Sequence, residues 1–156
     1  MIVVARICAL AALLLVSVLP DARAELRIEI KKGVDKAIPI AVVPFGWQGT
    51  GDTPPFDVAG LITADLGSTG RFAPINPSDM LEKPTIGRDV DFQDWRIIGA
   101  EVVIVGRLVE KGPGNFSIQY QVFDVFRGEQ LLGYRQPSSE AQLRISSHRV
   151  ADMIYE

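Results

Sequence analysis

The chain has 156 residues, of which 47% are hydrophobic and 22% charged, so it is predicted to form a globular domain rather than a disordered segment. Its 16 basic and 19 acidic side chains give a formal net charge of -3 without a dense basic block, which argues against nucleic-acid binding. One Cys and one His are too few for a structural zinc site or for a disulfide bond within the chain.

The first 24 residues have the layout of a secretory signal peptide. Residues 1–6 carry one Arg and no acidic side chain, and residues 7–19 are almost wholly apolar. That apolar run is short of the roughly 20 residues that a membrane-spanning helix needs. The small residues Ala22 and Ala24 stand at the two positions that a signal peptidase reads. We therefore expect export, with cleavage after Ala24.

In the stretch that follows, residues 25–35, apolar and charged side chains alternate from Leu26 to Ile30, and Lys31-Lys32-Gly33 ends the pattern. This period is typical of a strand with one wet face. Because a terminal strand keeps one edge unpaired, a partner's sheet can capture it through main-chain hydrogen bonds. The predicted partner-binding arm consists of Glu25, Leu26, Arg27, Ile28, Glu29, Ile30, Lys31, Lys32, Gly33 and Val34. The alternative is an ordinary edge strand of the domain's own sheet, which is expected to span residues 36–156.

Residues 38–75 are predicted to form a strand, a helix and a second strand. Residues 38–43 are apolar on both faces, as in a buried strand, and the Pro/Gly-rich residues 44–55 are expected to form a loop. Pro54-Pro55 suggests a helix start with Asp52 or Thr53 as N-cap. The helix is expected to carry its apolar stripe on Val58, Leu61, Ile62 and Leu66, with Gly70 just past its end. With a short strand at 71–75, this pattern predicts a right-handed βαβ crossover.

The second half of the domain is predicted to be a strand meander between two helices. Asp91 is expected to cap a short helix that carries Phe92, Trp95 and Ile98 and ends at Gly99, and residues 102–105 form an apolar strand. Residues 112–115 turn the chain into an alternating strand whose pattern flips after Val122, which indicates a bulge or a second buried face. A turn at Arg127-Gly128 leads to a third strand at 130–134.

Ser139 and Gln142 form a capping-box signature that opens a final helix, with Leu143, Val150 and Ile154 on one face. That helix has no stop signal before Glu156, so a longer protein is expected. The predicted fold is α/β: a small mixed sheet with a βαβ crossover, an antiparallel meander and two to three flanking helices. The expected core includes Val42, Leu61, Ile104 and Val150.

Three groups of residues are candidates for chemistry. The loop Gly46 to Asp52 lies between a strand and a helix like a phosphate-binding loop, but Asp52 stands where such a loop has lysine. His148, with Arg144 and Asp152 four residues to either side, resembles an oriented base, although no nucleophile elbow occurs. The acidic residues at 89, 91 and 94 lack the spacing of a calcium loop. We therefore predict no catalytic residue, cofactor or metal. Trp47 is predicted either to pack on the βαβ unit or to contact a partner.

Several stretches together resemble the amino-terminal domain of the TolB family. They are 38–45 (IPIAVVPF), 64–66 (ADL), 69–72 (TGRF), Asp94-Trp95, Gly99, 103–106 (VIVG), 123–134 (FDVFRGEQLLGY) and 148–156 (HRVADMIYE). Members of this family are periplasmic components of the bacterial Tol-Pal system, with this domain followed by a six-bladed β-propeller.

The resemblance implies a non-enzymatic adaptor that supports outer-membrane integrity and envelope constriction at cell division. In the family, the start of the mature chain binds TolA, which transfers to residues 25–34 of this sequence. The propeller binds the lipoprotein Pal. The alternative function is an exported ligand-binding domain or hydrolase that uses the Gly46–Asp52 loop.

Overall fold

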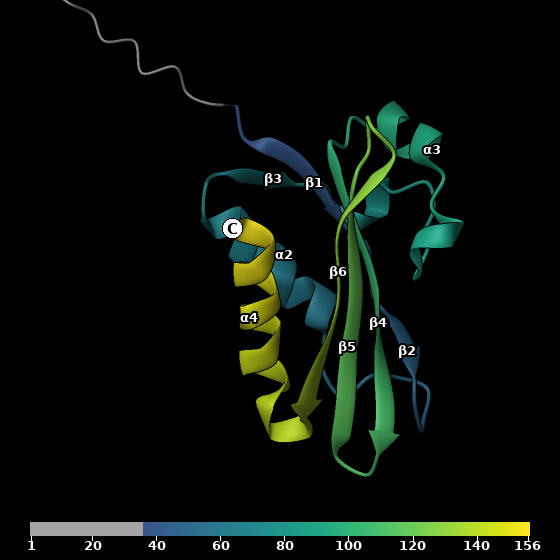
Figure 1. Cartoon of the computed structure of the whole chain (residues 1–156), viewed down its shortest axis with the longest axis vertical. Helices are drawn as coiled ribbons and strands as arrows, with labels where there is room; N and C mark the ends of the chain where they lie inside the picture. Colours follow the sequence, from purple (N-terminus) through teal and green to yellow (C-terminus); the bar gives the residue numbers. More distant parts are fainter. Residues whose placement is uncertain (1–35) are drawn as a thin grey trace, which may run out of the picture. The chain divides into compact units, whose positions relative to one another are not determined.

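The computed structural model describes residues 36–156, so the predicted signal peptide and the predicted arm lie outside the described residues. In Figure 1 the described chain forms one sheet, with the helices α2 and α4 on one face and α3 on the other. The strands are β1 (Ile38–Val42), β2 (Gly46–Gln48), β3 (Phe72–Pro74), β4 (Val102–Gly112), β5 (Asn115–Asp124) and β6 (Glu129–Ser139). The helices are α2 (Val58–Ser68), α3 (Phe92–Ile97) and α4 (Leu143–Tyr155), with short 3-10 turns η2 (Pro77–Asp79), η3 (Gly87–Asp89) and η4 (Glu140–Gln142).

The sheet has the strand order β3-β1-β4-β5-β6, and β2 pairs with the far half of β4. β1 pairs in parallel with both β3 and β4, whereas β4, β5 and β6 form an antiparallel meander. The parallel pairing of β1 with β3 through α2 confirms the predicted strand–helix–strand unit. The mixed α/β fold class is therefore confirmed.

The start of α2 differs from the sequence prediction. The helix begins at Val58, and the N-cap is Asp57, whose carboxylate accepts a hydrogen bond of 2.9 Å from the Gly60 backbone N–H. Residues 52–55 are exposed, so a helical turn there would bury no apolar surface. The cap therefore lies next to the first buried side chain rather than before Pro54-Pro55. Gly70 does follow the helix with a φ of 71°, as predicted.

The apolar stripe of α2 is also rotated from the predicted one. Val58, Ala59, Ile62 and Leu66 are buried, whereas Leu61 is only half-buried. At about 100° per residue, the four buried positions cluster within one arc and Leu61 lies at its flank. The prediction of Leu61 as a core residue was wrong, while Val42, Ile104 and Val150 are buried as expected.

Two apolar clusters lie on opposite faces of the sheet. The larger cluster, on the side of α2 and α4, contains Ile40, Ile104, Leu108, Ile118 and Val150. The smaller cluster, on the side of α3, contains Val43, Trp95, Val103, Val105 and Phe123. Successive residues of a strand point to opposite faces, which is why β1 and β4 read as unbroken apolar runs.

The predicted irregularity after Val122 is present in the pairing of β5 with β6. Val122 pairs with Leu132 but Phe123 pairs with Gln130, so Leu131 of β6 is the extra residue. Phe123 and Val125 are buried in the cluster on the α3 side, so the second buried face explains the flip along β5, whereas the extra residue of the bulge belongs to β6.

The predicted capping box at the start of the last helix is absent. Ser139 is the last residue of β6 and caps nothing with its side chain, because its backbone stays paired with Asn115. The chain then makes the turn η4, in which the Glu140 N–H donates to the Gly114 carbonyl at 3.0 Å, and α4 begins at Leu143. Leu143 and Val150 are buried and Ile154 is partly buried against the same cluster, as the predicted stripe requires.

Candidate functional site

The residues 44–55, predicted to be a loop, contain the short strand β2. Gly46, Trp47 and Gln48 pair in parallel with Arg107, Leu108 and Val109. The half-buried Trp47 ring packs on the larger cluster and lies 6.2 Å from the Phe116 ring centroid. Its Nε1–H donates to the Gly51 carbonyl at 3.0 Å. Trp47 therefore acts as a packing residue that closes the loop onto the sheet.

The loop between Gly46 and Asp52 does not have the geometry of a phosphate cradle. The Thr50 N–H donates to the carboxylate of Glu110 at 2.6 Å, and this hydrogen bond lowers the pKa of Glu110 from its ordinary value. The following helix, α2, begins beyond the loop, and the Asp57 carboxylate already accepts a hydrogen bond from one of its N-terminal backbone N–H groups. Both groups are acidic, so they would repel a phosphate. This geometry disfavours the phosphate-loop interpretation.

His148 has a partner that helical spacing did not reveal. Its Nδ1 lies 2.6 Å from the Asp65 carboxylate of α2, 83 residues earlier in the chain. The two side chains are 46% and 31% exposed, respectively. A concavity of about 530 Å³ adjoins the pair, between α2 and the C-terminal half of α4. Nearby, the Arg71 guanidinium donates to the Tyr155 carbonyl at 2.6 Å and lies 5.0 Å from the Tyr155 ring centroid. These contacts join the two helices at one end.

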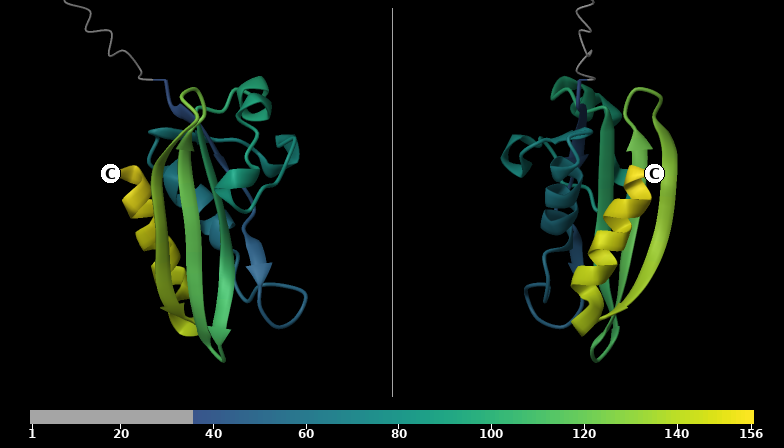
Figure 2. Two further views of the ribbon diagram at one scale, coloured as in Figure 1. Left: turned by 45° about the vertical axis from the view of Figure 1, so that its right-hand side comes forward. Right: turned by 90° about the vertical axis from the view of Figure 1, so that its left-hand side faces the viewer.

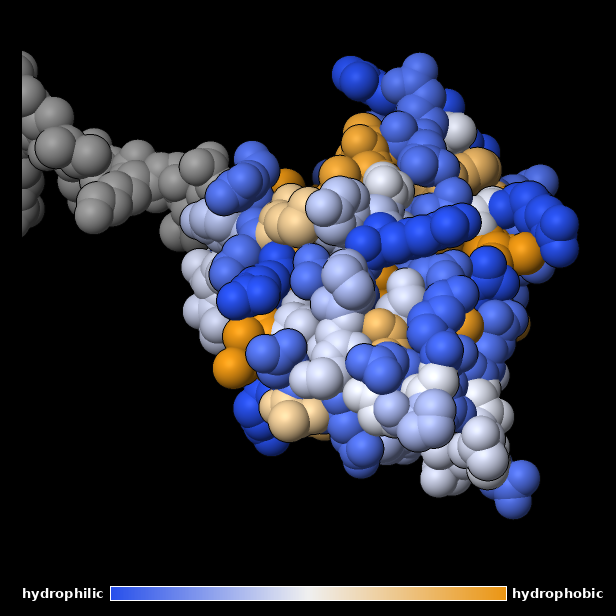
Figure 3. All heavy atoms as spheres, turned by 60° about the horizontal axis from the view of Figure 1, so that its bottom comes forward, coloured by the Kyte–Doolittle hydropathy of each residue, from blue (hydrophilic) through white to orange (hydrophobic). Residues whose placement is uncertain are grey.

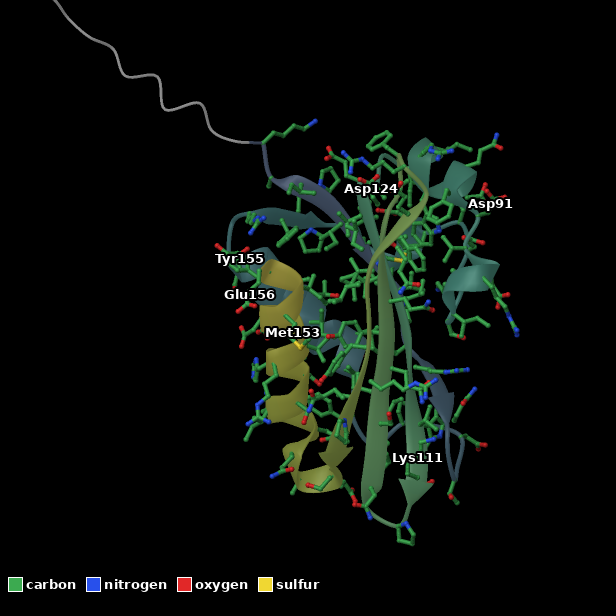
Figure 4. The ribbon with its side chains drawn as sticks, viewed as in Figure 1. Asp91, Lys111, Asp124, Met153, Tyr155 and Glu156 are labelled. Atoms are coloured by element: carbon green, nitrogen blue, oxygen red, sulfur yellow. The ribbon has the colours of Figure 1, made fainter. Side chains whose placement is uncertain are left out.

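Two of the three acidic residues near α3 have side-chain partners, and the third, Asp94, lies in the first turn of the helix. Asp91 caps α3 by accepting from the Gln93 N–H at 2.9 Å, and it lies at the start of that helix in Figure 4. Asp89 pairs with Arg88 at 3.5 Å on the surface. Within residues 36–156, no group of three or more His, Cys, Asp or Glu side chains is placed to hold a metal ion.

A further concave feature lies on the face of the sheet opposite α2 and α4. A groove of about 630 Å³ crosses β4, β5 and β6 and ends at the segment Thr85-Ile86. Its polar side chains come from Arg107, Gln119, Gln121, Gln130 and Arg135. The left view of Figure 2 shows that no helix covers the lower half of this face. Sequence reasoning missed this groove because its residues alternate with core residues along three strands.

Hydrogen bonds hold the groove's side chains in place. Arg107 Nε donates to Gln119 Oε1 at 3.2 Å. Gln121 Oε1 accepts from the Gly87 N–H at 2.8 Å, and its Nε2 donates to Gln130 Oε1 at 2.8 Å. Neither Arg107 nor Arg135 forms an ion pair with a described carboxylate. The groove therefore presents two guanidinium groups and several amides, a set of donors suited to carboxylates.

In Figure 3 the surface seen from the β4–β5 turn is mostly hydrophilic, with apolar residues in small separate areas. No helix in the described range is at once long enough and apolar enough to pass through a membrane.

Comparisons with known proteins agree on one family. The model of the TolB amino-terminal domain matches residues 26–131. The chain is 47% identical over 145 residues to the Tol-Pal system protein TolB of Thioalkalivibrio sulfidiphilus, covering 92% of this chain and 33% of that protein. It is 43% identical over 137 residues to the Tol-Pal system protein TolB of Nitrosococcus oceani, covering 88% and 31%. The chain thus spans about a third of the length of these relatives.

One solved structure supports the same assignment. The crystal structure of TolB from Acinetobacter baumannii superimposes with a TM-score of 0.63 at 27% sequence identity, covering 78% of this chain and 28% of that one. The C-terminal domain of LpoB from Salmonella enterica has a TM-score of 0.56 at 13% identity, covering 69% and 87%, which shows a shared fold only. With the family model matching most of the chain, and with the fold and relatives in agreement, the chain belongs to the TolB family through its amino-terminal domain.

Proposed function

We propose that the protein is a periplasmic, non-enzymatic adaptor of the Tol-Pal system that binds TolA through residues 25–34. The match of the TolB amino-terminal domain, which begins at residue 26 and so includes nearly all of the predicted arm, is the observation that carries this proposal. In the same proposal, Pal binds a propeller that follows this domain, and the two contacts together support outer-membrane integrity and envelope constriction at division.

The sequence of the arm suits strand addition to a partner. Leu26, Ile28 and Ile30 alternate with Arg27 and Glu29, so a strand formed here has one apolar and one charged face. Main-chain hydrogen bonds would supply affinity and the alternate side chains would supply specificity. Lys31-Lys32-Gly33 follows as a charged stretch that ends in a glycine, before the first described strand at Ile38.

Calorimetry with the C-terminal domain of TolA tests the arm. The chain beginning at Glu25 is expected to bind, and deletion of residues 25–34 is expected to abolish binding while thermal unfolding stays cooperative. Ile28→Pro, which removes one main-chain donor, should weaken binding, and Ile28→Val is the matched control that keeps the donor. Unchanged affinity after deletion would overturn the arm, and loss of folding would favour an edge strand of the domain's own sheet.

Export follows from the same proposal and has a separate test. The small residues Ala22 and Ala24 predict a mature protein that starts at Glu25. Intact-mass measurement of protein from the periplasmic fraction is expected to give that start. A membrane-bound species that retains Met1 would contradict it, without bearing on TolA binding by the purified chain.

A further inference from the structure

The outer edge of β6 has main-chain groups without a strand partner among residues 36–156. β6 ends the strand order of the sheet, and β5 is its only neighbour there. The right view of Figure 2 shows no element beyond the upper half of β6. The edge strand is 11 residues long, and α4 contributes buried side chains to the larger cluster on one face of the sheet.

The register identifies which groups of β6 point outward. The hydrogen bond from the Glu140 N–H to the Gly114 carbonyl makes Asn115 and Ser139 a non-hydrogen-bonded pair. In such a pair, the N–H and C=O of each residue point away from the partner strand. Because hydrogen-bonded and non-hydrogen-bonded pairs alternate along the ladder, the β6 residues opposite Ser117, Gln119 and Gln121 also direct their main-chain groups away from β5. These residues are Pro137, Arg135 and Gly133. Gly133 and Arg135 each present a free N–H and C=O, whereas Pro137 has no N–H and ends the accessible edge.

The side chains beside this edge make its two faces different. On one face, Arg135 and Arg107 line the groove, whose eleven lining residues include no carboxylate. This positive surface occurs on a chain with a formal net charge of -3. On the other face, Tyr134 is 49% exposed. A strand lying along β6 would meet guanidinium groups on one side and apolar surface on the other.

We propose that the edge of β6 at Gly133–Arg135 binds an extended segment of a partner protein that alternates acidic and apolar residues. The segment pairs its main chain with Gly133 and Arg135. A carboxylate on its groove side pairs with Arg135, the positive charge of Arg107 two strands further in adds attraction, and its apolar side chains cover Tyr134. The site consists of residues other than 25–34, so it would add a second partner to the proposed adaptor.

A second copy of the same chain fits this edge less well than an acidic segment. Two β6 strands pairing edge to edge in antiparallel fashion would bring Arg135 of each copy to the same face of the joined sheet. Directly opposed or diagonal neighbours lie about 5 to 8 Å apart, where like charges repel. Neither arginine has a carboxylate partner among the described residues to offset that repulsion. Charge complementarity therefore favours an acidic partner.

The test uses the chain from Glu25 to Glu156 and two blocked ten-residue peptides, one alternating Val with Glu and one alternating Val with Lys. NMR titration is expected to show that the Val-Glu peptide shifts the amide resonances of Gly133 and Arg135, and that the Val-Lys peptide does not. Combined Arg107→Glu and Arg135→Glu substitutions should weaken binding by at least about tenfold. Arg149→Glu, an exposed arginine of α4, is the matched control and should leave binding unchanged.

Strand addition is tested separately from charge. Gly133→Pro removes one outward N–H and should weaken binding. Two N-methylated Val-Glu peptides, one methylated on every Val and one on every Glu, test the same pairing without changing the protein, and one of them should lose binding. Equal binding of the Val-Lys peptide, no binding of the Val-Glu peptide, or full binding of both N-methylated peptides would each overturn the proposal. Self-association of the protein that disappears in Gly133→Pro would assign the edge to a second copy instead.

Discussion

Along β4 and β5, most side chains on the face under α2 and α4 are buried, whereas the opposite face is buried only over part of the strand length. On the helix face, Ile104, Leu108, Phe116 and Ile118 are all at most 6% exposed. On the opposite face, Val103 and Val105 are fully buried, but the next residues on that face, Arg107 and Val109, are partly exposed. The short segment from η2 to α3 covers less length than α2 and α4 do, so part of one face stays open.

The difference shows how a small domain keeps a binding surface without weakening its core. Two helices bury most of one face of the long strands, and this face holds the larger apolar cluster. On the second face, the side chains around Trp95 are apolar and buried, whereas the groove beyond this cluster is lined mainly by polar side chains. Substitutions in the two buried clusters should therefore lower the free energy of unfolding, whereas substitutions in the exposed groove should change binding instead.

The largest expected loss of stability comes from the closed part of the second face. Trp95 is 1% exposed, and its Nε1–H donates to the Glu82 carboxylate at 2.7 Å. Trp95→Ala should lower the free energy of unfolding by about 3 to 5 kcal/mol, because it removes a large buried side chain and leaves a cavity. Chemical denaturation measures this change. Trp95→Phe should cost less, since it keeps most of the ring volume, and a loss below about 1 kcal/mol for Trp95→Ala would show that the second cluster is not a real core.

A pair of truncations on one strand compares the two faces directly. Ile104→Ala, on the helix face of β4, should lower the free energy of unfolding by about 2 to 5 kcal/mol. Val109→Ala, five residues along and on the open face, should cost about 1 kcal/mol or less, because Val109 is already partly exposed. Similar losses for the two variants in urea denaturation would contradict the assignment of the open face.

A cap substitution tests where the helix that covers the first face begins. Asp57→Ala removes the acceptor for the Gly60 N–H and should cost about 1 kcal/mol, within the usual range of about 0.5 to 2. Asp52→Ala, at the cap predicted from sequence, should change stability by less than about 0.5 kcal/mol, since its side chain is exposed and forms no cap. If Asp52→Ala destabilised the protein more than Asp57→Ala in thermal or urea unfolding, the helix would begin at the earlier position predicted from the sequence.

The sequence predicted the elements whose side chains repeat with a clear period and missed those set by distant partners. The strand at 38–43, the short helix capped by Asp91 and the buried run at 102–105 follow from local patterns, and all are present. β2 was missed because Gly46–Gln48 has a loop composition and becomes a strand only by pairing with β4, about 60 residues later. Register and pairing of this kind leave no local signal.

The candidate sites follow the same rule. The pairing of His148 with Asp65 depends on the packing of α4 against α2, so helical spacing pointed instead to Arg144 and Asp152. The groove also appears only after the register brings Arg107, Gln119 and Arg135 onto one face of three neighbouring strands. The phosphate-loop pattern, in contrast, was a local resemblance that the position of Asp57 removes.

The smallest expected effect on stability at neutral pH comes from the ionisation of Tyr120, which lies on the helix face of β5, next to the edge strand β6. Burial, with a smaller contribution from neighbouring Tyr134, raises the pKa of Tyr120 from 10.0 to about 12. Its hydroxyl donates to the sulfur of Met153 at 3.6 Å, and Met153 extends from α4 in Figure 4. Because the pKa in the folded state lies above the unfolded value, the stabilisation is fully present below about pH 10 and is lost as the pH rises toward 12. Absorbance titration of the tyrosines should therefore show one late step that disappears in Tyr120→Phe. Tyr134→Phe should move that step only slightly, since burial is the larger cause. A folded protein whose tyrosines all ionise near pH 10 would show that the hydroxyl of Tyr120 is open to water, and that this face of the sheet is less fully closed than its packing indicates.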